Sequence, residues 1–186
     1  MNHIFEITWS VWFLSEILLN RLFRSNMKSS KNQDRNSLRL IWITIIVSIS
    51  LGIISKFLVE FPMAKSAWLS YSGLLIIVIG MVIRFIAILT LRRFFTVDLS
   101  IQHNHELINK GLYKYIRHPS YTGSLISFLG FSISMNNWIS AIIIFVPVLL
   151  VFLHRMKLEE QLLLEKFGDK YLEYTKNTAR LIPGVY

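Results

Sequence analysis

The residues best suited to chemistry fall in two short polar clusters, one at each end of a long apolar block. The first cluster spans residues 111–121, in which Arg117 and His118 precede Pro119. Proline is favoured at the first position of a helix, where backbone N–H groups without partners attract anions. Arg117 and His118 add side-chain donors beside that helix start. The pattern predicts an anion site; the alternative is an interfacial belt of Tyr113, Tyr115 and Tyr121 at headgroup depth.

The second cluster, residues 154–160, follows the same apolar block. Arg155 and Glu159 are four residues apart, which places them on one face of a helix. Held together in a partly apolar site, such a pair suits a zwitterionic ligand, whereas on a surface it is a salt bridge worth about 0.2–0.5 kcal/mol. Past this pair, an apolar stripe interrupted at Gly168 is predicted to lay the tail over the first cluster. The stripe consists of Leu158, Leu162, Phe167 and Tyr171.

The composition shows what must position these clusters. Of 186 residues, 53% are hydrophobic and 17% are charged, and the mean hydropathy is +0.49; soluble domains carry about 25% charged residues. The net charge is +9, and the basic residues lie between and after the apolar blocks. Membrane topology places basic residues there, so the charge does not indicate nucleic acid binding. The chain has no cysteine, which excludes a disulfide scaffold. We therefore expect an integral membrane protein built from helices.

The apolar blocks predict a polytopic, all-α membrane bundle of about five transmembrane helices in a single domain, residues 1–186. Residues 1–100 supply three spans, and residues 101–186 supply the polar clusters, a helical hairpin and the tail. The hairpin turns at Asn136 and Asn137, each of its arms is short for a full crossing, and Pro147 is expected to kink the second. The predicted helices cover residues 4–23, 38–58, 68–91, 121–135 and 138–153.

Basic residues set the expected orientation. They concentrate in the first loop, in residues 92–119 and after the hairpin, and the Asn136-Asn137 turn has none. The positive-inside rule then places the N-terminus outside and both polar clusters and the tail in the cytoplasm. Because Glu6 and Glu16 interrupt the first apolar block, we interpret it as a span and not as a cleaved leader.

Other sites familiar from soluble enzymes have no support in the sequence. No Gly-x-Gly-x-x-Gly or His-Glu-x-x-His motif occurs, and His103 and His105 are spaced unsuitably for a metal pair, so no metal is predicted. Arg84 stands alone inside an apolar block, where a charge costs about 2.5–3.5 kcal/mol. It either snorkels to the membrane surface, pairs with Glu16, or has a functional role.

Together the two clusters resemble the isoprenylcysteine carboxyl methyltransferase family and its phospholipid methyltransferase relatives. The resemblance covers residues 107–183, in the C-terminal half of the chain. Two separated motifs in the right order, flanking a hairpin, make it specific. They are Leu107-Ile108-x-x-Gly111-x-Tyr113-x-x-x-Arg117-His118-Pro119-x-Tyr121-x-Gly123 and Arg155-x-x-x-Glu159-Glu160-x-x-Leu163-x-x-x-Phe167-Gly168-x-x-Tyr171-x-x-Tyr174, followed by Arg180 and Pro183.

This resemblance implies methyl transfer from S-adenosylmethionine to a lipophilic acceptor that enters from the bilayer, foremost the carboxylate of an isoprenylcysteine-like substrate. It makes residues 101–186 the cofactor-binding region and gives Arg155 the substrate carboxylate as its ligand. The residues that would contact the cofactor are His105, Glu106, Leu107, Ile108, Tyr113, His118, Pro119, Ser120, Tyr121 and Glu159.

Three alternatives remain open at this point. A phospholipid N-methyltransferase would need a base, for which Glu159 or Glu160 is available. Some membrane reductases that use NADPH resemble the C-terminal pattern loosely, and a non-catalytic helical scaffold would need no cofactor. In each case the expected location is a multi-pass position among membrane lipids, in the cytoplasmic membrane of a prokaryote or the endoplasmic reticulum of a eukaryote.

Overall fold

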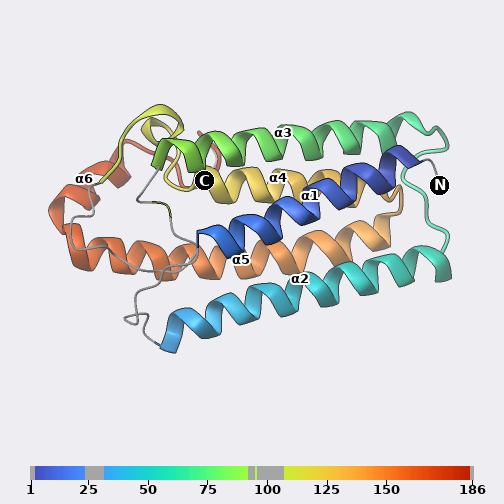
Figure 1. Cartoon of the computed structure of the whole chain (residues 1–186), viewed down its shortest axis with the longest axis horizontal. Coiled ribbons are helices and arrows are strands. Elements are labelled where there is room, and N and C mark those ends of the chain that lie inside the picture. Colours follow the sequence, from blue (N-terminus) through green and yellow to red (C-terminus); the bar gives the residue numbers. More distant parts are fainter. Residues whose placement is uncertain (1–2, 24–31, 92–94, 96–106, 185–186) are drawn as a thin grey trace.

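The chain folds into long helices that run side by side and alternate in direction (Figure 1). The computed structural model describes residues 3–23, 32–91, 95 and 107–184. Within that part there is no strand, only an isolated parallel bridge between Ile116 and Ala179. The elements are α1 (His3–Leu22), α2 (Asn32–Leu58), α3 (Trp68–Leu91), the 3-10 helix η2 (Gly111–Lys114), α4 (Pro119–Ser134), α5 (Trp138–Phe167) and α6 (Asp169–Lys176).

Three of the described helices are long and apolar enough to cross a membrane, namely those over Asn36–Leu58, Trp68–Leu91 and Trp138–Phe167. By the same measure α1 falls short because it contains Glu6 and Glu16. The helix α4 has 16 residues, about 24 Å of rise. The prediction of an all-helical membrane fold is thus confirmed.

The observed boundaries differ from the predicted ones in two helices. The helix α2 begins at Asn32 and not at residue 38, so polar residues form its first turns. The prediction that the second hairpin arm is short for a crossing is wrong, because α5 has 30 residues and continues past residue 153 to Phe167. That length is about 45 Å, against a hydrocarbon core of about 30 Å. The extension is rich in Leu, Glu and Lys, which favour helix, and it ends at Gly168.

The helices α3 and α4 pack with their backbones unusually close. A Cβ atom added at Gly130 would lie 2.6 Å from the Ile77 backbone nitrogen, and one at Gly123 would lie 2.6 Å from that of Arg84. Small residues permit this approach between membrane helices. The contact fixes the start of α4 against the last turns of α3. Its glycines repeat at heptad spacing: Gly73 and Gly80 on α3, and Gly123 and Gly130 on α4.

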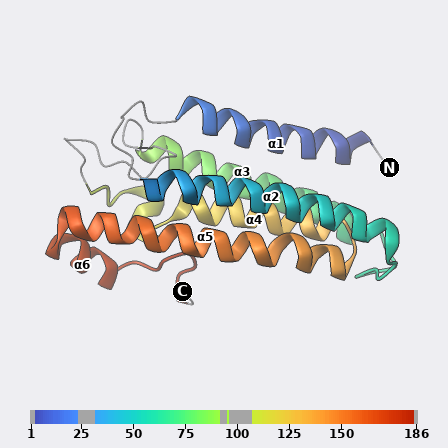
Figure 2. The same ribbon diagram turned by 90° about the horizontal axis from the view of Figure 1, so that it is seen from below.

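The first helix lies along the outside of this pair, as Figure 2 shows. An aromatic cluster attaches it to the core: the ring of Trp12 lies 4.9 Å from that of Phe128 on α4 and 5.4 Å from that of Phe131. Phe128 in turn lies 6.1 Å from Phe152 on α5. Trp12 is 1% exposed, so this cluster is the interior of the bundle.

The hairpin turns where the sequence predicted, at Asn136 and Asn137. The Asn136 side chain accepts a hydrogen bond from the Ala64 backbone N–H (3.0 Å) and donates one to the Ala64 carbonyl (2.9 Å). Asn137 donates to the Val59 carbonyl (2.7 Å) and accepts from the Ser140 N–H (3.0 Å), which caps α5. These two side chains, called the amide turn below, close one end of the bundle.

Candidate functional site

The opposite end of the bundle is built around the start of α4. Gly111, in a left-handed conformation (φ 57°), opens η2, and His118 is the N-cap residue before Pro119, the first residue of α4. The helix start predicted from the proline is therefore confirmed. The first N–H groups of a helix have no partner inside it and attract anions.

Residues 177–182, called the tail below, return to this helix start. The Arg117 N–H donates to the Ala179 carbonyl (2.8 Å), and the His118 N–H donates to the Arg180 carbonyl (3.2 Å). In the reverse direction, the Ala179 N–H donates to the Tyr115 carbonyl (3.0 Å). The tail thus forms a wall beside the entry into α4.

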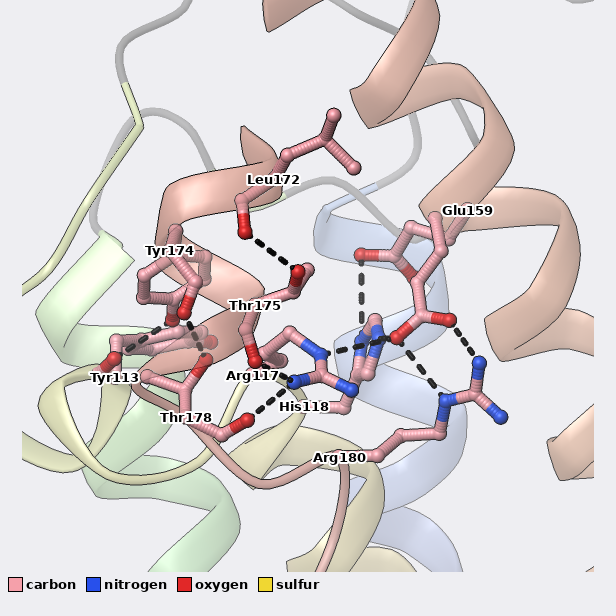
Figure 3. Close-up of polar contacts among 10 residues, drawn as sticks. Tyr113, Arg117, His118, Glu159, Leu172, Tyr174, Thr175, Thr178 and Arg180 are labelled. Atoms are coloured by element: carbon pink, nitrogen blue, oxygen red, sulfur yellow. Dashed lines mark hydrogen bonds and ion pairs between the residues drawn. The ribbon is translucent and has the colours of Figure 1, made fainter. Parts of the chain in front are cut away.

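The Glu160 carboxylate joins α5, the entry into α4 and the tail. Its partners Arg117, His118 and Arg180 are labelled in Figure 3. The carboxylate accepts hydrogen bonds from Arg117 Nε (3.1 Å), Arg180 Nε (3.0 Å) and a terminal nitrogen of Arg180. His118 Nε2 lies 3.3 Å from the same carboxylate and donates to it, because a carboxylate only accepts. We call these four residues the Glu160 cluster.

Glu159 faces the same helix start from α5. Its carboxylate accepts a hydrogen bond from the Tyr121 hydroxyl (2.8 Å) and lies 3.9 Å from His118 Nδ1. The His118 side chain is 2% exposed, whereas that of Glu159 is 32% exposed. The structure therefore brings the two sequence clusters together, and of the two acidic residues Glu159 is the one with an accessible carboxylate.

Tyr113 is buried in η2, and its backbone carbonyl accepts a hydrogen bond from the Tyr174 hydroxyl on α6 (2.6 Å; Figure 3). Burial raises the pKa of Tyr113 well above its usual range, and the charge of Glu159 raises it further. Burial also raises the pKa of Tyr174 to about 12. Both phenols consequently keep their protons at neutral pH.

The remaining predicted cofactor contacts lie just before η2. Leu107 and Ile108 are half-buried there, whereas His105 and Glu106 lie outside the described residues, as does His103. Among the residues that the structure describes, no group of three His, Cys, Asp or Glu side chains is arranged to hold a metal ion.

Arg155 occupies the interior between α5 and α2. Its side chain is 1% exposed, and a terminal nitrogen donates to the Ser37 hydroxyl. Its charge also interacts with the Tyr121 hydroxyl, the partner of Glu159. The interpretation of Arg155 and Glu159 as a surface salt bridge is therefore wrong for Arg155. Nothing in the sequence signals Ser37, because only the packing of α2 on α5 brings it there.

Arg84 lies on α3 beside the start of α4. One terminal nitrogen is 2.9 Å from a Glu16 carboxylate oxygen on α1, so the pairing that the sequence analysis gave as one of three alternatives is present. The other donates to the Ser120 carbonyl (3.2 Å) and the Ser120 hydroxyl (3.1 Å), contacts that sequence reasoning missed.

Tyr171 of α6 carries a polar group that the structure leaves unbonded. Its ring is 3% exposed, and its hydroxyl is buried without a hydrogen-bond partner among the described residues. The charges of Glu160, Glu159 and Arg117 all act on this hydroxyl. The sequence analysis assigned Tyr171 to an apolar stripe. Its hydroxyl was the signal that it could also bind a polar group, because buried tyrosine hydroxyls usually have a hydrogen-bond partner.

The chain is similar in sequence to known proteins. The model of the isoprenylcysteine carboxyl methyltransferase family matches residues 73–165, half of the chain. Protein-S-isoprenylcysteine O-methyltransferase A of Arabidopsis thaliana is 37% identical over 131 residues, which are 69% of this chain and 66% of the relative. Protein-S-isoprenylcysteine O-methyltransferase of Homo sapiens is 34% identical over 118 residues, which are 62% of this chain and 42% of the relative.

A solved structure is similar to this chain in both fold and sequence. The eukaryotic intramembrane Ras methyltransferase ICMT (isoprenylcysteine carboxyl methyltransferase) superposes with a TM-score of 0.61 at 31% identity, covering 77% of this chain and 52% of the other. The chain thus spans about two thirds of the plant relative's length and about half of the solved protein's. The matched region contains most of α3, all of α4 and most of α5, and so includes the start of α4 and both Glu159 and Glu160. The chain belongs to the isoprenylcysteine carboxyl methyltransferase family.

Proposed function

We propose that the protein transfers a methyl group from S-adenosylmethionine to the carboxylate of an isoprenylcysteine-like lipid. The observation that carries this proposal is the contact of the α4 start with the acidic part of α5, through Tyr121 and Glu159 at 2.8 Å. The two sequence motifs on which the family resemblance rests meet at that contact. The names of the matched relatives support the same chemistry.

The groups around the α4 start fit S-adenosylmethionine. The accessible carboxylate of Glu159 suits its ammonium group, and the helix start beside His118 suits its carboxylate. Aromatic side chains at Tyr113 and Tyr121 suit its adenine. The unbonded hydroxyl of Tyr171 is a further buried group that awaits a polar partner. We assign the remaining contacts to Leu107, Ile108, Pro119 and Ser120, with His105 and Glu106 outside the described residues.

Methyl transfer to a carboxylate needs little acid–base chemistry from the protein. When bound, S-adenosylmethionine supplies an electrophilic methyl group on a sulfonium. The acceptor carboxylate is already ionised at neutral pH, so no general base is needed. Arg155, buried and charged, binds that carboxylate in place of the Ser37 hydroxyl and fixes its direction. Orientation in a site without bulk water contributes several kcal/mol to such a displacement.

The membrane arrangement that fits this site has five crossings in one domain. The helices alternate in direction, and the site lies at the end where α1 and α3 finish and α2 and α4 begin (Figure 1). The positive-inside rule places this end in the cytoplasm and the N-terminus outside. The expected membrane is the cytoplasmic membrane of a prokaryote or the endoplasmic reticulum of a eukaryote, and the prenyl chain enters from the lipid between helices.

Two measurements on purified protein in detergent test the proposal. Radiolabelled methyl transfer from S-adenosylmethionine is expected for a farnesylcysteine analogue and not for phosphatidylethanolamine. In calorimetry, S-adenosylmethionine is expected to bind and NADPH is not. Labelling of the phospholipid alone would instead support an N-methyltransferase, and heat from NADPH alone a reductase. Absence of binding heat from both compounds would support a non-catalytic scaffold.

A further inference from the structure

Arg84 connects three helices at the end of the bundle that holds the site. Its guanidinium lies 2.9 Å from the Glu16 carboxylate of α1 and donates to both oxygens of Ser120 on α4. The side chains of Arg84 and Glu16 are 13% and 15% exposed. A charged group so enclosed in apolar helices is costly, and such residues usually serve a function.

The contact with Ser120 reaches the part of α4 that meets the cofactor. Ser120 follows Pro119 in the first turn of the helix, next to Tyr121, whose hydroxyl binds Glu159. The α4 backbone has no slack there, because Gly123 packs directly on the backbone of Arg84. The two hydrogen bonds from Arg84 are therefore a side-chain link between this close helix contact and the turn that contains Ser120.

The shape of the Arg84 guanidinium suits simultaneous contact with Glu16 and Ser120. One terminal nitrogen faces Glu16 and the other faces Ser120. A planar group holds these directions at a fixed angle, whereas the ammonium of a lysine is a single point that reaches one partner at a time. Glu16 therefore orients Arg84, and Arg84 orients Ser120.

We infer that Arg84 is a positioning residue that holds the first turn of α4 in the geometry that binds S-adenosylmethionine. Glu16 of α1, which lies outside the region matched by the family model, keeps its guanidinium in place. The inference rests on the proposed function, because it assumes that the α4 start is the cofactor site. It assigns a role to a residue that the two sequence motifs do not include.

The rival explanation is that Arg84 and Glu16 only form an ion pair that stabilises α1 against α3. The double exchange Glu16→Arg with Arg84→Glu separates the two explanations. It restores an ion pair between the helices, but a glutamate at position 84 has no donor for the Ser120 oxygens. A structural pair predicts that the exchange recovers both thermal stability and cofactor binding; a positioning role predicts that it recovers stability alone.

The experiment measures the Kd of S-adenosylmethionine by calorimetry, and the melting temperature, for the wild type, the exchange, Arg84→Lys and Glu16→Gln. We expect Arg84→Lys and the exchange to weaken binding about 10-fold, the loss of one or two hydrogen bonds to the turn. Glu16→Gln keeps an acceptor for Arg84, and we expect at most about a 2-fold effect. In turnover assays, Arg84→Lys is expected to raise KM for S-adenosylmethionine and leave kcat at saturation unchanged.

Ser127→Ala is the matched control. Its hydroxyl also links α4 to α3, by a 3.1 Å hydrogen bond to the Ile77 carbonyl, but farther along the helix pair. We expect it to alter stability slightly and binding not at all. Wild-type affinity in Arg84→Lys, or recovery of binding by the exchange, would overturn the inference. If the exchange fails to fold, Arg84→Lys decides alone, and a wild type that binds no S-adenosylmethionine refutes the proposed function itself.

Discussion

The two ends of the bundle are closed in different ways. At the amide turn, neutral side chains of Asn136 and Asn137 bond to backbone groups of the α2–α3 loop and of α5. At the other end, the Glu160 cluster joins charged side chains from α5, the α4 entry and the tail. One end is held by neutral amide groups bonded to the backbone, the other by charged side chains bonded to one another, and both ends join segments that are far apart in the sequence.

The difference shows which end has groups left for a ligand. Each described amide group of the turn has a backbone partner within hydrogen-bond distance. The charged end holds an accessible carboxylate at Glu159 and a buried, unbonded hydroxyl at Tyr171. Buried polar groups normally have partners. Of the two ends, the charged one is therefore the end with polar groups left for a ligand.

The largest effect is expected from Arg155→Ala. It removes the group assigned to the acceptor carboxylate, and we expect kcat to fall by about 100-fold or more, as for loss of one charge-stabilising donor. Affinity for S-adenosylmethionine should change little. Steady-state methyl transfer and calorimetry measure the two quantities. Retained turnover in a folded variant would refute the role of Arg155.

The glycines allow the two ends to be compared with a single kind of substitution. Gly123→Ala and Gly73→Ala each place a Cβ atom 2.5–2.6 Å from a backbone nitrogen across the α3–α4 contact. Overpacking costs about 1–3 kcal/mol, more than the helix propensity gained by alanine. We expect similar losses of thermal stability for both. Only Gly123→Ala, at the site end, should also weaken cofactor binding; equal binding losses would contradict the division of roles.

Glu160→Gln tests how the tail is held. The neutral amide has a weaker attraction for Arg117 and Arg180, which both bond to Glu160. We expect faster hydrogen exchange at the Ala179 amide, by about 10-fold, because the local opening costs less. Exchange at the Ser140 amide, in the amide turn, is the internal control and should not change.

The smallest effect on activity is expected at the amide turn. Asn137→Ala removes the N-cap of α5 and the bond to the Val59 carbonyl, and we expect a loss of about 1–2 kcal/mol in stability. Asn137→Ser restores the cap only and should recover part of that loss. Methyl transfer by either variant, assayed below its melting temperature, should equal the wild type.

Local signals accounted for much of the fold and for the main parts of the site. The bounds of α3 followed from its apolar run, and the start of α4 followed from Pro119. The length of α5 was underestimated because the predicted arm ended with the continuous apolar run at residue 153, whereas the amphipathic stretch that follows continues the same helix to Phe167. The partners Ser37 and Ser120 depend on how whole helices pack, and a serine has no pattern that reveals such a contact.

The pairing of Arg117 and His118 with the tail has a consequence for biosynthesis. Their partners follow roughly sixty residues later in the chain. The wall beside the α4 entry therefore cannot form during synthesis until Arg180 has been translated and has left the ribosome. A nascent chain whose long helices have all been inserted therefore still lacks the segment that completes this end of the bundle.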